Sequence, residues 1–255
     1  MATEQVRKVF EEVGSMAGFT ARFFREAFTP RFEFREFLRQ CYFIGNKSFT
    51  LVGITAFIMG LVITIQSRPT LVEFGAEAWL PKMVSISLVR EIAPVITALI
   101  CAGKVGSGIG AELGSMKVTE QIDAMEVSGT NPFKYLIATR VLATTLMVPV
   151  LGIMADGISL FGAYLGANMR GVVSWDLFWN QVFDTLTFGD VIPAITKTVF
   201  FGMAIGLVGC YKGYNTMKGT EGVGMSANAA VVVSSLLVFL IDLIAVQIAD
   251  IFSLT

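Results

Sequence analysis

The segment from Ser85 to Pro149 reads SISLVREIAPVITALICAGKVGSGIGAELGSMKVTEQIDAMEVSGTNPFKYLIATRVLATTLMVP. Two apolar runs flank a short acidic insert, 119–127, whose residues favour a helix. Each run is long enough to cross a bilayer, which leaves the insert in water. The segment therefore predicts two membrane-spanning helices joined by a short helix, and the rest of the chain is interpreted around them.

Small residues recur at every fourth position of the first run. On a helix this spacing forms one smooth stripe, and in lipid such a stripe lets another helix backbone approach closely. The alternative is a chance cluster of glycines in a loop, but the strict spacing and the apolar residues between the glycines favour a packed helix. The stripe consists of Ala98, Ala102, Gly106, Gly110 and Gly114.

The composition places the whole chain in a membrane. Of its 255 residues, 54% are hydrophobic and only 15% are charged, whereas a soluble domain carries about a quarter charged residues. The net charge of −1 gives no indication of a nucleic-acid partner. Because the chain has no histidine, histidine-based metal sites and Ser-His or Cys-His catalysis are excluded, and we expect no metal site and no catalytic residues. Three isolated cysteines, Cys41, Cys101 and Cys210, show no metal-ligand spacing and are interpreted as buried packing residues.

Five apolar stretches reach the roughly 20 residues that a bilayer requires, so we predict an all-α integral membrane protein with a single domain, 1–255. Lys and Arg concentrate before the first stretch and in the loops after the second and fourth. By the positive-inside rule, the N-terminus is cytoplasmic and the C-terminus is outside. The predicted spans are about 49–66, 85–111, 134–160, 191–211 and 226–250.

Residues 1–48 are polar and amphipathic, and we expect them to form helices in the membrane interface, separate from the transmembrane region 49–255. The alternative is a soluble helical hairpin that packs on a partner protein. The external loop 167–190 predicts another amphipathic helix, which begins at the N-cap residue Ser174 and rests on the outer leaflet or on an external partner. In the N-terminal region, Phe34, Phe37, Leu38, Cys41 and Ile44 share one helical face, while Glu33, Arg35, Glu36 and Arg39 fall mostly on the other.

Four charged residues lie at a similar depth inside the predicted spans, where ionisable side chains are costly and indicate function. At 1.5 Å per residue, Arg90, Glu91, Lys197 and Asp242 all lie about 8–12 Å from the external side. We call these four residues the charge tier; Asp156 in the third span is a further candidate member. Mutual pairing would offset the cost of removing the charges from water. Two interpretations stay open: a functional site, or an ion-pair network that only fixes helix packing.

Several ordered strings resemble the MlaE/YrbE family of ABC-transporter permeases. They are LVREIAPV at 88–95, AGKVGS at 102–107, AELGSM at 111–116, TEQIDAME at 119–126 and the pair Asn131-Pro132. The resemblance extends from about Phe49 to the C-terminus.

The resemblance implies a non-enzymatic, homodimeric permease in the bacterial inner membrane, without a cofactor of its own. It implies a cytoplasmic ABC ATPase dimer that binds ATP and Mg, and a periplasmic MCE-domain carrier to which phospholipid is passed. It also implies that the charge tier contacts the substrate. Two other classes stay open: an ion-coupled secondary transporter, and a membrane scaffold without transport activity. The segment Glu120–Val127 matches the family's coupling helix, with Glu120, Ile122, Asp123, Met125 and Glu126 as the residues expected to meet the ATPase.

Overall fold

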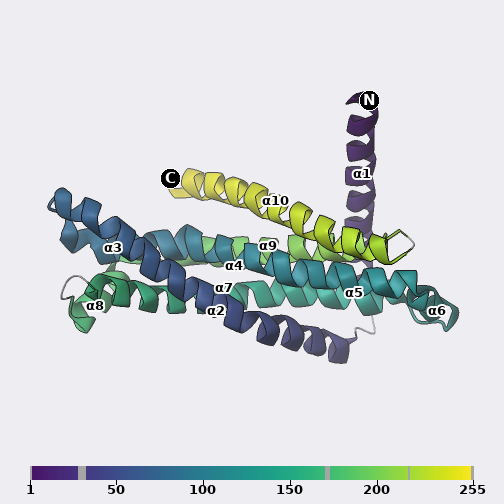
Figure 1. Cartoon of the computed structure of the whole chain (residues 1–255), viewed down its shortest axis with the longest axis horizontal. Helices are drawn as coiled ribbons and strands as arrows, with labels where there is room; N and C mark the ends of the chain where they lie inside the picture. Colours follow the sequence, from purple (N-terminus) through teal and green to yellow (C-terminus); the bar gives the residue numbers. More distant parts are fainter. Residues whose placement is uncertain (1, 28–32, 170–172, 218, 254–255) are drawn as a thin grey trace.

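The structure is a computed structural model that describes residues 2–27, 33–169, 173–217 and 219–253. Within these ranges every regular element is helical, and five helical stretches are long and apolar enough to cross a membrane, as predicted. The five stretches run along the long axis of the molecule (Figure 1). They are Phe34–Glu73, Glu77–Val118, Phe133–Asn168, Phe188–Tyr214 and Thr220–Ile251.

The helices follow one another with short connections. In chain order they are α1 (Ala2–Ala27), α2 (Phe34–Glu73), η1 (Glu77–Trp79), α3 (Leu80–Ser87), η2 (Leu88–Ile92), α4 (Ala93–Cys101), η3 (Ala102–Gly106), α5 (Ser107–Val118), α6 (Gln121–Val127), η4 (Phe133–Ala138), α7 (Thr139–Asn168), α8 (Trp175–Thr185), α9 (Phe188–Tyr214) and α10 (Thr220–Ser253). Figure 1 places α6 and α8 at opposite ends of the bundle, which we call the α6 end and the α8 end.

The first span begins earlier than predicted. The helix α2 runs without a break from Phe34, so residues 34–48 continue into the helix of the first span and do not form a separate helix. The predicted apolar face is divided here: Cys41 and Ile44 are buried, whereas Phe34 and Leu38 are exposed. Of the predicted charged face, Glu36 is buried. Glu36 accepts a hydrogen bond of 2.8 Å from the Gln40 side chain, and this partner lowers the cost of burying a carboxylate.

The α7 helix is the centre of the bundle and the most buried of the five spans. It packs against α2 through two glycines: a β-carbon at Gly60 would collide with the carbonyl of Ser159, and one at Gly162 would collide with the carbonyl of Phe57. Without side chains at these points, the two backbones come into direct contact, which is how helices associate closely in lipid.

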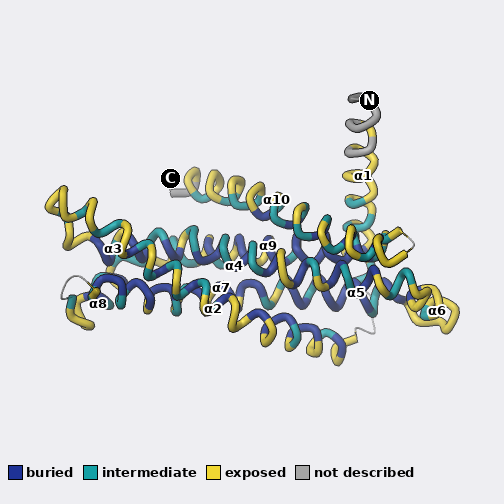
Figure 2. Tube along the Cα trace, in the orientation of Figure 1, coloured by how far each residue is buried: buried dark blue, intermediate teal, exposed yellow. Residues whose placement is uncertain are grey.

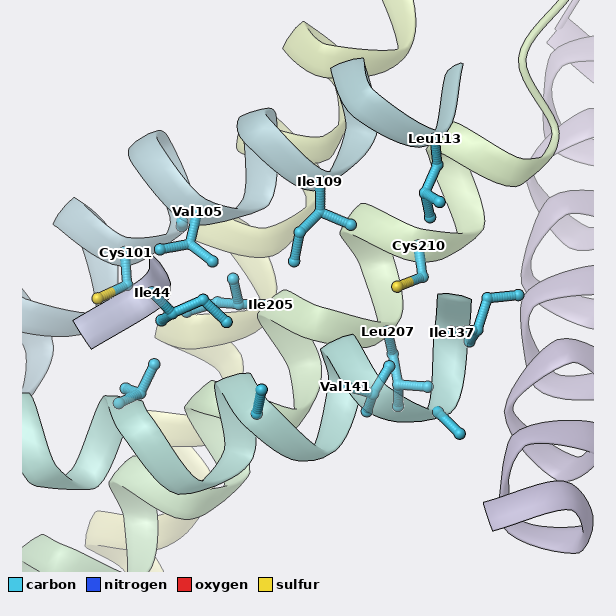
Figure 3. Close-up of a cluster of buried hydrophobic side chains, with 14 of the residues drawn as sticks. Ile44, Cys101, Val105, Ile109, Leu113, Ile137, Val141, Ile205, Leu207 and Cys210 are labelled. Carbon is cyan, nitrogen blue, oxygen red and sulfur yellow. The ribbon is translucent and has the colours of Figure 1, made fainter. Parts of the chain in front are cut away.

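The small-residue stripe packs within this chain, against α9 and α10. A β-carbon at Gly110 would stand 3.3 Å from Cβ of Ala230, and one at Gly213 of α9 would stand 2.9 Å from the carbonyl oxygen of Gly110. All five residues of the stripe are buried. Figure 3 shows the adjoining apolar core, in which Ile109 and Leu113 lie opposite Cys210 of α9.

Two shorter helices cover the ends of the bundle. At the α6 end, α1 stands across the direction of the spans (Figure 1) and is anchored by the buried Phe23. At the α8 end, Ser174 caps α8 as predicted, accepting a hydrogen bond of 3.3 Å from the Leu177 amide. The apolar face of α8 packs partly within this chain, because Phe178 and Val182 are fully buried in a cluster with residues of α3 and α7.

The α10 helix separates from the bundle toward the C-terminus (Figure 1). Its outer half is largely exposed (Figure 2), and it is the least buried and most apolar of the five spans. Two cavities lined by residues of α9 and α10 lie at the α8 end, beside the predicted charge tier, and we call the space between these helices the α9–α10 wedge.

Candidate functional site

Lys197 of α9 joins three helices at one point. Its side chain is only 4% exposed, and Nζ lies 2.6 Å from Oε2 of Glu91 and 2.9 Å from Oδ1 of Asp242. Glu91 belongs to η2 and Asp242 to α10, so the ion pairs cross from α9 to both neighbours. A buried ammonium without such partners would be strongly disfavoured. The structure therefore brings together three of the four residues that similar depth had suggested.

Arg90, the fourth residue of the tier, is directed elsewhere. Its Nε lies 3.3 Å from Oδ1 of Asp190, which is itself fixed as the third residue of α9. Asp190 accepts hydrogen bonds from the backbone and hydroxyl groups of Thr187 at 2.9 and 2.7 Å, forming a capping box. The sequence analysis missed Asp190, although the Thr-x-x-Asp pattern before an apolar run signals a helix start.

Adjacent Arg90 and Glu91 find different partners because neighbouring side chains on a helix point in different directions, and here they lie in a wide turn. Residues Leu88–Ile92 form a π-helical turn, in which the Ala93 amide donates to the Leu88 carbonyl five residues back. The extra residue in this turn changes the direction of the side chains relative to a regular α-helix. Pro94, which cannot donate a backbone hydrogen bond, follows immediately. Such π turns are frequent at functional sites.

Two cavities flank the charge tier. One, of about 410 Å³, is lined by Arg90, Glu91, Asp190 and Lys197 together with residues near the end of α10. The other, of about 520 Å³, shares Arg90 and Lys197 but is otherwise mostly apolar, with a wall that includes Ile192, Phe200 and Ile248. The α9–α10 wedge thus contains a charged cavity next to an apolar one, and this arrangement suits an amphiphilic ligand.

The predicted coupling segment forms the helix α6, joined to α5 by Glu120 in a left-handed conformation with φ 58°. Two of its apolar residues do not face solvent as expected: Ile122 is fully buried, and Met125 packs against the same core. The acidic residues Glu120, Asp123 and Glu126 are exposed. Asp123 is held by Lys117 of α5 at 2.8 Å.

Known proteins resemble this chain over most of its length. The family profile described as Permease MlaE matches residues 37–248. A probable ABC transporter permease protein of Rickettsia typhi is 36% identical over 233 residues, covering 91% of this chain and 90% of the relative. A probable ABC transporter permease protein of Synechocystis is 36% identical over 221 residues, covering 87% and 84%.

A third relative carries a more specific name. The intermembrane phospholipid transport system permease protein MlaE of Haemophilus influenzae is 34% identical over 209 residues, covering 81% of this chain and 80% of the relative. The chain belongs to the MlaE permease family. Together with the five apolar helices, membership in this family identifies it as a multi-pass membrane protein.

Two further features of this MlaE-family chain concern its acidic residues. Asp156 of α7 interacts electrostatically with Lys197 without a direct ion pair, and its Oδ1 is buried with no hydrogen-bond partner among the described residues. The same described residues contain no group of three His, Cys, Asp or Glu side chains that could hold a metal.

Proposed function

We propose that this chain is the permease subunit of an ABC transporter that moves phospholipids between the bacterial inner membrane and a periplasmic MCE-domain carrier. The observation that carries the proposal is the buried Lys197 ion-pair centre between a charged and an apolar cavity. The name of the Haemophilus relative supports phospholipid as the substrate class.

The proposed orientation places the α6 end in the cytoplasm and the α8 end outside. Lys and Arg residues before α2, after α5 and after α9 support this orientation through the positive-inside rule. The charge tier then lies toward the periplasmic side, where a lipid can be exchanged with a carrier. The α1 helix, which crosses the direction of the spans, lies along the inner surface of the membrane.

Within the tier, Arg90 binds the lipid phosphate and Lys197 holds the site together. Lys197 already bridges two carboxylates, whereas Arg90 is 45% exposed and lines both cavities. The exposed part of the guanidinium is accessible to a phosphate, the anion that a guanidinium binds best. An acyl chain occupies the apolar cavity.

The energy for transport comes from a separate ATPase dimer, which binds ATP and Mg in place of any cofactor in this chain. ATPase closure can act on the permease only through contacts that differ between two states. The exposed surface of α6 provides these contacts, and its buried Ile122 transmits the movement to the core. Two copies of this chain form the complete permease.

The test is Arg90→Gln in a reconstituted assay with ATPase, carrier and labelled phospholipid. We expect transfer to fall about tenfold, because one charge-assisted contact of roughly 1.5 kcal/mol is lost. The Lys197 ion pairs remain, so the variant should stay folded. The matched control is Lys82→Gln, which removes a positive charge from the same end outside the cavities. Unchanged transfer by Arg90→Gln would reduce the tier to a packing network.

A further inference from the structure

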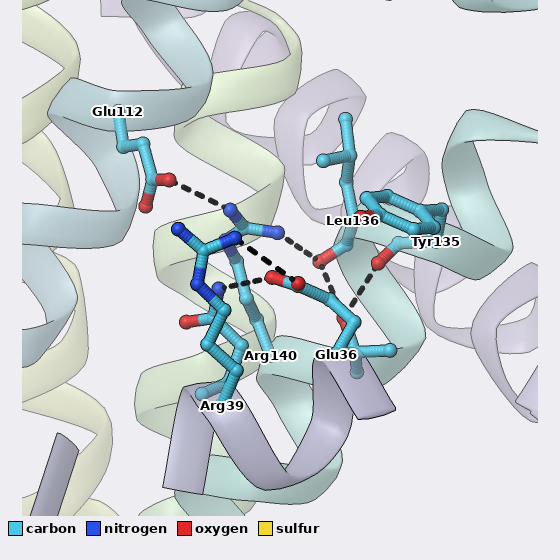
Figure 4. A network of polar contacts seen from close by, with 8 residues as sticks. Glu36, Arg39, Glu112, Tyr135, Leu136 and Arg140 are labelled. Atoms are coloured by element: carbon cyan, nitrogen blue, oxygen red, sulfur yellow. Dashed lines mark hydrogen bonds and ion pairs between the residues drawn. The ribbon is translucent and has the colours of Figure 1, made fainter. Parts of the chain in front are cut away.

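A second charged cavity lies at the α6 end, far from the tier. It has a volume of about 380 Å³ and is enclosed by the beginning of α2, the middle of α5 and the η4–α7 junction. Figure 4 shows Glu36 and Arg39 from α2 converging on Glu112 and Arg140. From the sequence, residues 1–48 were expected to form interfacial helices, and Arg140 was given no role.

Arg140 is the buried element of this cavity. Its side chain is 3% exposed, and its two Nη groups donate to Oε1 of Glu112 at 2.8 Å and to the Leu136 carbonyl at 3.0 Å. Its Nε is also buried but has no hydrogen-bond partner among the described residues. A buried donor without a partner is rare and costly. Because Arg140 forms part of the cavity wall, an anion bound inside the cavity can interact with the charge of its guanidinium.

The other charges of the lining leave room for an anion. Glu112 is bound to Arg140, and Glu36 accepts from Gln40 at 2.8 Å and lies 3.5 Å from Arg39. Lys47 forms part of the wall and lies 4.5 Å from the ring of Phe43, an uncharged partner. Three cations of the lining thus face two carboxylates, which leaves one excess positive charge.

The position along α7 selects a lipid over a soluble anion. Arg140 and Asp156 are separated by 16 residues on one helix, about 24 Å at 1.5 Å per residue, and the hydrocarbon core of a bilayer is about 30 Å thick. The two charged regions therefore lie at the depths of the two opposite leaflets. Beside the cavity, the outer face of α2 exposes Phe34, Leu38 and Tyr42, which can contact acyl chains.

We propose that the cavity around Arg140 binds the phosphate of a phospholipid head group in the leaflet at the α6 end, as a second lipid site. The cations Arg140, Arg39 and Lys47 bind the phosphate, and Glu36 limits the affinity by competing with it. The proposal rests on the proposed function for the class of ligand but not on the charge tier.

The experiment is photo-crosslinking of the purified permease in detergent with a phosphatidylglycerol analogue that carries a diazirine, followed by mass spectrometry of peptides covering 34–47 and 133–142. The double variant Arg39→Gln, Lys47→Gln removes two cations but leaves the Arg140–Glu112 pair intact. We expect the yield in these peptides to fall about tenfold or more. Glu36→Gln should instead increase the yield, because the amide still accepts from Gln40 but no longer competes with the phosphate.

Arg90→Gln is the matched control, since it alters the tier alone and should leave these peptides labelled as before. An undiminished yield in the double variant would overturn the proposal. So would a loss in Glu36→Gln, which would show that the network has only a packing role. Excess unlabelled phosphatidylglycerol should displace the probe, and inorganic phosphate should not. Equal displacement by inorganic phosphate would overturn the lipid assignment in favour of a soluble anion. Because no ATPase or transport is involved, these outcomes are independent of whether Arg90→Gln blocks transfer.

Discussion

At Lys197, residues that lie 106 and 45 positions away in the chain meet on one ammonium group. Sequence reasoning predicted that Glu91, Lys197 and Asp242 lie at similar depth, because depth follows from the constant rise of a helix. It did not predict the partner of Arg90, because the direction of a side chain depends on helix rotation. The π turn at Leu88–Ile92 alters that rotation, and nothing in a hydropathy pattern reports it.

The first prediction at the residue scale concerns Gly110. Replacing it by Leu places bulk against Ala227 and Ala230 of α10, so Gly110→Leu should destabilise the folded chain by about 1–3 kcal/mol. The matched control is Gly108→Leu, since a β-carbon at Gly108 meets nothing within 4 Å. Both variants gain the same helix propensity, so the difference between their melting temperatures in detergent reports packing alone. Equal melting temperatures would show that α10 does not pack on this stripe.

At the scale of elements, the long apolar helices were the most predictable, because a bilayer leaves a spanning chain almost no other structure. The boundary of α2 was not predictable. Residues 34–48 carry the charges of an interfacial helix, yet Glu36 is buried and accepts a hydrogen bond from Gln40. The prediction for Ile122 of α6 was wrong because burial depends on contacts that are distant in the sequence. An apolar residue in a short loop helix resembles a docking residue, but in the structure the core covers Ile122.

The prediction at this scale concerns the surface of α6. Val127 is 90% exposed at the end of the helix, so it lies on the surface that is proposed to contact the ATPase. Val127→Asp should reduce the amount of ATPase that co-purifies with the permease several-fold, while melting is unchanged. Phe74→Asp, at an exposed apolar residue of the α8 end, controls for the added charge. If both variants retain the ATPase equally, α6 is not the docking element.

For the molecule as a whole, the bundle is closed around α7 but open along α10. Sequence patterns predicted five spans without saying which of them lack neighbours, because exposure to lipid and burial in protein select the same apolar residues. The structure distinguishes them: Leu236 and Leu243 of α10 are exposed, although they lie in the most apolar span. A helix that is so little buried in its own chain is the surface on which we expect a second copy to pack.

That expectation is tested by disulfide crosslinking along α10. The native Cys41, Cys101 and Cys210 are all buried, so an introduced surface cysteine should react alone. In a symmetric dimer a residue meets its own copy only near the twofold axis. A cysteine scan over 236–243 should therefore give crosslinked dimers at positions spaced three or four residues apart, such as Leu236→Cys with 64% exposure. Ile58→Cys, 49% exposed on α2, should remain monomeric under the same oxidation. Dimers from Ile58→Cys but from no position of the α10 scan would place the interface on α2. The α9–α10 wedge would then face lipid and would not be shared by two copies.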